Sequence, residues 1–205
     1  MANKAAGLLL AAGACLPATS AAAQENAVLP AELSRTIANC ESCHGPKGNS
    51  VTPATPRLNG QQAGYLAAQL RNFRNPAMED PHAIDAMWKT ATQTGDEMVT
   101  ALANHFASQA ATPPQPGNGP LAAEGRKIFE QGAAAQNLPV CASCHGLQAE
   151  GNGAIPRLAG QHAAYLTHAM EVLQLELRES DVMHPKLNQI TDEQIQALVA
   201  YLAND

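Results

Sequence analysis

The chain has 205 residues and a formal net charge of −6, from 12 Lys and Arg residues against 18 Asp and Glu residues. This acidic balance argues against nucleic acid as a partner, because binding to phosphates needs clustered positive charge. Aromatic residues make up only 3% of the chain, so its core is short of large side chains. A bulky apolar group supplied from outside would repair that deficit.

Residues 1–23 have the pattern of an export signal. Lys4 supplies the positive charge, residues 5–16 form a short apolar run, and Ala21-Ala22-Ala23 fits the small-residue pattern before a cleavage site. The run is shorter than the roughly 20 residues that span a bilayer, and no later segment is apolar for that long. We therefore predict a periplasmic mature chain without a transmembrane segment. Cys15 leaves a lipoprotein anchor open as the alternative.

Two short motifs hold the other four cysteines. They are Cys40-Glu41-Ser42-Cys43-His44 and Cys141-Ala142-Ser143-Cys144-His145. Cys-x-x-Cys-His is the attachment motif of c-type haem, in which each thiol adds to one vinyl group of the porphyrin and the His ligates the iron. Zinc, a thioredoxin-like redox pair and disulfides are the alternatives. None of them explains a His directly after both pairs, so the sequence predicts two covalently attached c-type haems.

The motifs belong to a longer internal repeat. Pro56-Arg57-Leu58 with Tyr65-Leu66 returns as Pro156-Arg157-Leu158 with Tyr165-Leu166, at an offset of 100. Between the copies, residues 111–120 are rich in Pro and Gly and predict a linker. We therefore predict a first domain at 24–110 and a second domain at 121–205.

Apolar residues at helical spacing predict the same helices in both copies. In chain order, we expect helices at 31–43 and 61–73, a third through Val99 and Phe106, two more at 120–131 and 161–175, and a last one through Ile195 and Leu202. Thr191 and Gln194 form a capping box at the start of the last helix. Alternating strand patterns are absent, so the predicted fold class is all-α, with long loops around the haems.

The repeat also predicts the second axial ligand of each iron. His/Met ligation raises the reduction potential and is common in c-type electron carriers. The repeat offset shrinks from 100 to 96 towards the C-terminus, so a repeated ligand pair must be 96 to 100 residues apart. Met87 and Met183 meet this condition, whereas core filling is the alternative role of a methionine. Met78, Met98 and Met170 have no methionine at that distance, and the rival ligands His82 and His184 have no histidine at the matching place in the other copy.

Several neighbouring residues have open roles. The carbonyl of Pro56 or Pro156 either accepts a hydrogen bond from a haem histidine or belongs to a proline that simply ends a loop. Arg57 and Arg157 either pair with haem propionates or are solvated. Trp88, directly after Met87, is a candidate wall of the haem pocket. We expect three histidines without a counterpart in the other copy at the surface: His105, His162 and His168.

These features together resemble cytochrome c4, a two-haem class I cytochrome c, over nearly all of the mature chain. The resemblance implies two tandem class I cytochrome c domains, each wrapped around one haem, with the haems near the domain interface. It also implies the ligand pairs His44 with Met87 and His145 with Met183, and a periplasmic electron carrier that feeds a terminal oxidase or related acceptor. Residues 175–178 and Thr94-Gly95 depart from the family's usual sequence.

We therefore predict an electron carrier rather than an enzyme. Its expected partners are redox proteins such as a membrane oxidase, a quinol-oxidising complex or a dehydrogenase. A cytochrome subunit of a dehydrogenase complex is the first alternative. A two-haem peroxidase or thiosulfate oxidiser is the second, but the paired methionines argue against the open iron that a peroxidase needs.

Overall fold

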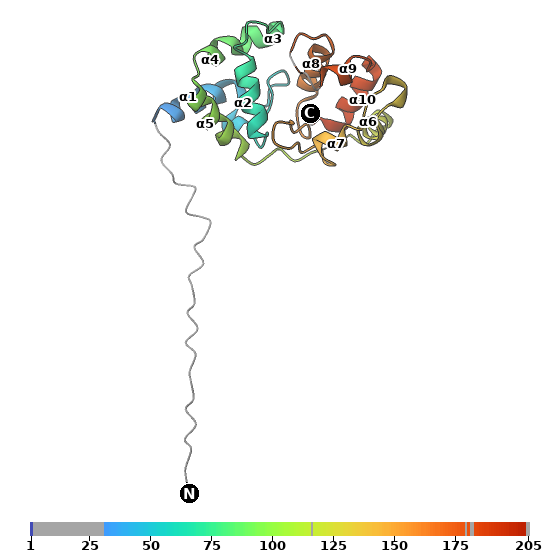
Figure 1. The fold of residues 1–205 in the computed structure, drawn as a ribbon, viewed down its shortest axis with the longest axis horizontal. Coiled ribbons are helices and arrows are strands. Elements are labelled where there is room, and N and C mark those ends of the chain that lie inside the picture. The colour runs from blue at the N-terminus through green and yellow to red at the C-terminus, as the bar shows by residue number, and fades with distance from the viewer. Residues whose placement is uncertain (2–30, 116, 179, 181–182, 204–205) are drawn as a thin grey trace. The chain divides into compact units, whose positions relative to one another are not determined.

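The computed structural model describes residues 1, 31–115, 117–178, 180 and 183–203. Residues 31–205 form one compact unit, which contains residues 31–110 of the predicted first domain and the predicted second domain (Figure 1). Residues 2–23 of the predicted export signal, including Cys15, lie outside the described residues, and so does the side chain of His184. Within the described ranges, no helix is long and apolar enough to cross a membrane.

The first domain contains the helices that its sequence predicts. Helix α1 (Ala31–His44) carries the first haem motif at its C-terminal end and is followed by the 3-10 turn η2 (Pro46–Gly48). Helix α2 (Ala63–Asn72) packs against helix α5 (Asp96–Ala107). Three short segments lie between them in the chain: α3 (Pro81–Ala83), the π-helical turn η3 (Ile84–Trp88) and α4 (Lys89–Thr92).

The second domain follows the same plan with one difference. Helix α6 (Pro120–Gln131) ends before the haem motif, which lies on its own short helix α7 (Ala142–His145) after the 3-10 turn η4 (Ala134–Gln136). Helix α8 (Ala163–Gln174), helix α9 (His184–Leu187) and helix α10 (Asp192–Leu202) complete the domain. The described residues contain isolated bridges but no strand, which confirms the all-α prediction.

Side-chain capping explains where two of these segments begin. At α10, Thr191 Oγ1 accepts from the backbone N–H of Gln194 at 3.3 Å, and Gln194 Oε1 accepts from the N–H of Thr191 at 3.0 Å. The predicted capping box is therefore confirmed. At α3, the side chain of Asp80 caps the helix and Pro81 occupies its first turn, a position that suits a residue without an N–H.

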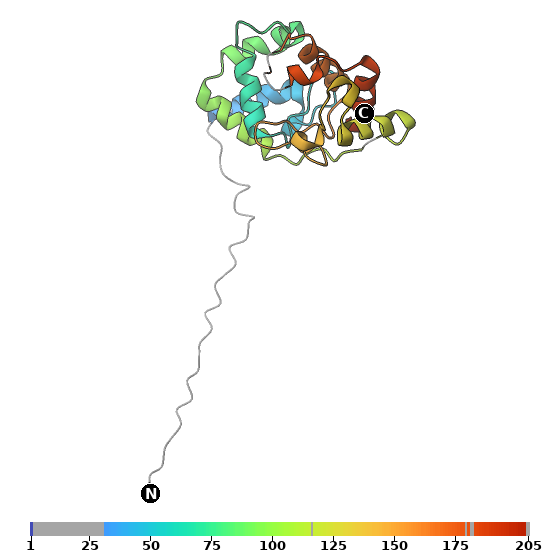
Figure 2. The ribbon, with the colours of Figure 1, turned by 45° about the vertical axis from the view of Figure 1, so that its right-hand side comes forward.

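Each domain has its own core. In the second domain, α6 packs closely against α10 (Figure 1; Figure 2). The side chain of Phe129, on α6, is completely buried. The crossing is close because Gly125 has no side chain at that point: a Cβ there would lie 1.8 Å from the carbonyl oxygen of Ala197. The first domain has a smaller core cluster, in which Ile37, Leu102 and Phe106 are buried.

The linker lies against both domains. A Cβ at Gly60 would lie 2.4 Å from the Cβ of Ala111, so the linker touches the backbone of the first domain there. The side-chain amide of Asn59 donates to Thr112 Oγ1 at 3.1 Å, and the carbonyl of Thr112 accepts from Arg157 Nη2 at 3.3 Å. This segment is therefore part of the interface between the domains rather than a free tether.

Candidate haem sites

The two haem motifs present four free thiols. Cys40 and Cys43 are three residues apart in α1, so their side chains lie on one helical face. Burial raises the pKa of Cys40 and that of Cys141 to about 11. Among the described residues, no group of three His, Cys, Asp or Glu side chains could hold a metal ion. The His directly after each Cys pair is the feature that favours haem over zinc or a redox pair.

The histidine of each motif is buried and oriented by a proline carbonyl. His44 Nδ1 lies 2.9 Å from the carbonyl oxygen of Pro56, and His145 Nδ1 lies 3.0 Å from that of Pro156. Because a carbonyl only accepts, Nδ1 carries the proton in both rings and Nε2 keeps its lone pair. Burial lowers the pKa of both histidines, which favours the neutral imidazole that ligates iron. The hydrogen bonds expected for Pro56 and Pro156 are confirmed.

The repeat-matched methionines lie in different local structures. Met183 is half-buried in the turn before α9, and its N–H donates to Ser180 Oγ at 3.0 Å. Met87 is half-buried in η3. Met87 does not lie in one of the long loops expected around the haems, because Asp80 and Pro81 start a helical stretch that continues through it. Among the rival methionines, Met98 lies against the core of the first domain, Met170 lies against the same core cluster of the second domain as Met183, and Met78 is buried.

Apolar side chains around the motifs fit a haem. In the first domain, α2 has no fully buried side chain, and its half-buried Leu66 and Leu70 share a core cluster with Cys40. In the second domain, Met183 packs against the same core cluster as Cys141. A flat apolar macrocycle attached at the cysteines would remove such surfaces from water, which is favourable. Trp88, the candidate pocket wall, is 48% exposed.

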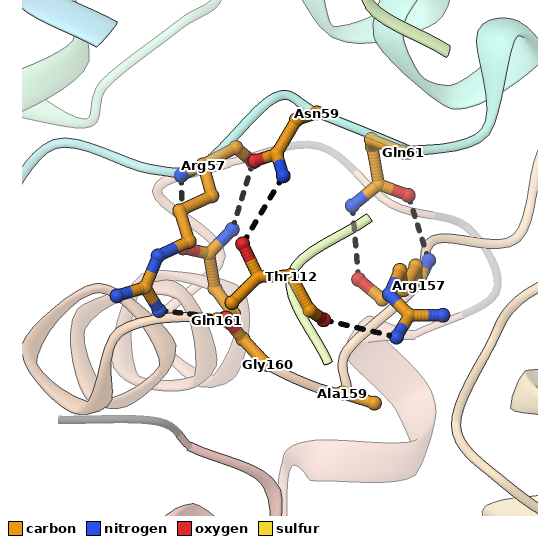
Figure 3. A pocket seen from close by; sticks show the side chains of 8 residues that line it. All are labelled: Arg57, Asn59, Gln61, Thr112, Arg157, Ala159, Gly160 and Gln161. Atoms are coloured by element: carbon orange, nitrogen blue, oxygen red, sulfur yellow. Dashed lines mark hydrogen bonds between the residues drawn. The ribbon is translucent and has the colours of Figure 1, made fainter. Parts of the chain in front are cut away.

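The repeated segments of the two domains pair with each other (Figure 3). Gln61 Nε2 donates to the carbonyl of Arg157 at 2.9 Å, and Gln61 Oε1 accepts from the N–H of Arg157 at 2.7 Å. Gln161 makes the same two bonds to Arg57, at 3.0 and 2.9 Å. Both glutamines are buried, and the cavity that remains between the loops is only about 10 Å³. The interface is therefore tight at this point.

No role is predicted for Gln61 and Gln161 from the sequence, although their exact repetition 100 residues apart indicates a shared function in the two copies. A polar residue that recurs at the same place in both copies, without a ligand role, is a candidate for a contact between the copies. The guanidinium groups of the neighbouring arginines also bond to backbone: Arg57 Nη1 donates to the carbonyl of Gly160 at 2.7 Å, for example. They are therefore not simply solvated.

Two histidines that were expected at the surface are contacts between the domains instead. His162 is 3% exposed, and its Nε2 lies 3.0 Å from the carbonyl oxygen of Ser50. His168 Nε2 lies 3.1 Å from Asp80 Oδ1, and the His168 side chain is 26% exposed. The surface expectation is wrong because both partners belong to the other copy, far away in the chain.

Two helical domains, each with a free Cys-x-x-Cys pair and a buried histidine of fixed tautomer, define an electron-transfer protein with two covalent c-type haems. The chain belongs to the cytochrome c family, because the family model described as Cytochrome c matches residues 31–110 and 122–204.

Individual relatives agree with this assignment. A cytochrome c4 of Thiocapsa roseopersicina is 34% identical over 170 residues, which is 80% of this chain and 85% of the relative. The thiosulfate dehydrogenase electron acceptor of Thiomonas intermedia is 34% identical over 174 residues, which is 81% of this chain and 78% of the relative. The structure of Acidithiobacillus ferrooxidans cytochrome c4 matches with a TM-score of 0.75 and 32% identity, over 80% of this chain and 98% of that one. The chain is thus a dihaem electron carrier of the cytochrome c4 type, as its sequence predicts.

Proposed function

We propose that the chain is exported to the periplasm, where it carries single electrons from a respiratory or dehydrogenase donor to a terminal acceptor. The observation that carries this proposal is the pair of buried motif histidines, His44 and His145, each oriented by a proline carbonyl and each matched by a methionine at the same place in the repeat. Such a pair of sites, closed by protein ligands on both faces, suits electron transfer better than chemistry at an open iron.

The proposed axial ligands are His44 with Met87 and His145 with Met183. When bound, each haem supplies a one-electron couple whose potential the thioether ligand raises. The four cysteines hold the two macrocycles covalently. The carbonyls of Pro56 and Pro156 hold the imidazole rings in the tautomer that presents Nε2, as outer partners of metal-ligating histidines do.

Carbon monoxide binding to the reduced holoprotein tests whether each iron has a protein ligand on both faces. We expect no carbon monoxide difference spectrum in the native protein. Met87→Leu and Met183→Leu keep the side-chain volume but remove the thioether, so each variant should bind carbon monoxide at one haem and lower the potential of that haem. Met98→Leu and Met170→Leu are matched controls, because neither methionine has a methionine at the matching place in the other copy of the repeat. Carbon monoxide binding by the native protein would contradict the assignment. So would a Met87→Leu or Met183→Leu variant with the carbon monoxide spectrum and haem potentials of the native protein.

A second candidate is a cytochrome subunit of a dehydrogenase complex. It is favoured by the relative from Thiomonas intermedia, which is named as the electron acceptor of a thiosulfate dehydrogenase. Native size-exclusion chromatography from the source cells separates the two candidates. Elution as a single cytochrome chain supports the free carrier. Co-elution with a dehydrogenase that reduces the cytochrome in the presence of thiosulfate supports the subunit.

A further inference from the structure

A carboxylate of the first domain is completely buried at the boundary between the domains. The side chain of Asp80 is 0% exposed. Within its own domain, Oδ1 accepts from the backbone N–H groups of His82 and Ala83 at 3.1 and 3.3 Å, which caps α3. A buried charge is costly unless it is paired, so two N–H groups alone do not explain why an ionised side chain lies here.

The paired charge comes from the second domain. Arg178 Nη2 donates to Asp80 Oδ2, and the Arg178 side chain is only 6% exposed. His168, from α8, places Nε2 at 3.1 Å from Asp80 Oδ1. Burial alone would raise the pKa of Asp80, but the charge and the hydrogen bond of Arg178 hold that pKa below its ordinary value. Asp80 is therefore an ionised group of one domain seated in a basic site of the other.

Further contacts join the same two segments. The Arg178 guanidinium lies over the ring of Phe73 at 5.6 Å from its centroid, and the rings of His82 and His168 stack at 4.6 Å. The N–H of Glu79 donates to the carbonyl of Leu177 at 3.1 Å. The paired Gln and Arg loops form a separate part of the interface, so this cluster adds a second point of attachment.

We propose that Asp80 and Arg178 form a lock that holds the two cytochrome c domains in one relative orientation, which makes Asp80 a positioning residue for electron transfer between the two haem sites of the chain. The charge of Asp80 matters because Arg178 is buried beside it and has its own charge to neutralise. In Asp80→Asn, Arg178 keeps its charge but loses its buried partner, and removal of one member of a buried pair is strongly destabilising. Separation of the domains lets water reach Arg178, so this variant weakens the interface while each domain keeps its fold.

The variants distinguish the effect of the Asp80 charge from the effect of its cap at the start of α3. Asn is a good helix N-cap, so Asp80→Asn preserves the start of α3 and removes only the negative charge. The double variant Asp80→Asn with Arg178→Gln removes both charges, so neither side chain is left as an unpaired buried charge. Asp96→Asn is the matched control, since Asp96 is 70% exposed and pairs with Arg71 and Arg74 within the first domain.

Small-angle X-ray scattering of the dihaem protein, and flash-triggered kinetics of electron exchange between its haems, test the lock. We expect Asp80→Asn to keep both haem spectra, to raise the population of separated domains on the order of 100-fold, and to slow electron exchange between the haems. The double variant should recover most of the native scattering curve and exchange rate, and Asp96→Asn should match the native protein. Compact scattering by Asp80→Asn, equal separation in the single and double variants, or loss of a haem spectrum in Asp80→Asn would each overturn the proposal. Failure of the methionine assignments would leave these scattering results unchanged, so the two proposals fail separately.

Discussion

Substitution of Gly125 by Ala tests the close crossing of α6 and α10, which forms the scaffold of the second haem site. An added Cβ would lie 1.8 Å from the carbonyl oxygen of Ala197 and 2.9 Å from the backbone nitrogen of Leu198. Both neighbours are backbone of α10, so relief requires the helices to move apart by roughly the missing 1.5 Å of normal contact distance. An approach of 1.8 Å to backbone places the cost of overpacking in the upper part of its usual range, about 2–3 kcal/mol, and the better helix propensity of Ala returns about 1 kcal/mol. We expect a net loss of about 1–2 kcal/mol.

Guanidinium chloride unfolding of the dihaem protein, followed by far-ultraviolet circular dichroism, measures this loss. Gly119→Ala is the control, because Gly119 precedes the same helix with a φ of −83° and no atom lies within 4 Å of the added Cβ. We expect that variant to change the free energy of unfolding by less than about 0.5 kcal/mol. A Gly125→Ala protein as stable as the Gly119→Ala protein would refute the reasoning from helix contact.

Two further predictions concern charge and capping. The folded-state pKa of Asp80 lies below its ordinary value of 3.8, so its carboxylate adds stability above about pH 4 that is lost as the pH falls through the folded-state pKa. The difference in unfolding free energy between the native protein and Asp80→Asn should therefore shrink on acidification in this range, and a difference that grows would contradict the assignment. Thr191→Ala removes the capping box of α10 and should cost about 1 kcal/mol, seen as a fall in Tm of about 2–4 °C. Thr100→Ala, in the interior of α5, serves as the control and should leave the Tm nearly unchanged.

The helices and the motif geometry were accessible from the sequence because they depend on short chain segments. Apolar residues three and four positions apart predict one helical face wherever they occur. The capping box of Thr191 needs only a residue three positions on. The contact between each motif histidine and its proline was also expected, since Pro56 and Pro156 occupy matching places after the two motifs.

The contacts between the domains were not accessible in the same way. His162 and His168 have no counterpart in the first copy, so the repeat gave no reason to bury them. Their partners, Ser50 and Asp80, lie 112 and 88 residues away in the chain. Nothing in the local sequence around Asp80 indicates that Arg178 neutralises it.

By itself, the sequence determined what this protein carries and where, because thiol spacing, histidine placement and helical periodicity are properties of a few consecutive residues. Only the tertiary structure decided how the two domains meet. Burial of Gln61, Gln161, Asp80 and Arg178 is favourable only because each finds its hydrogen-bond or charge partner in the other domain. Such partners come together through the docking of two folded surfaces, which is a property of the whole chain and of no single segment.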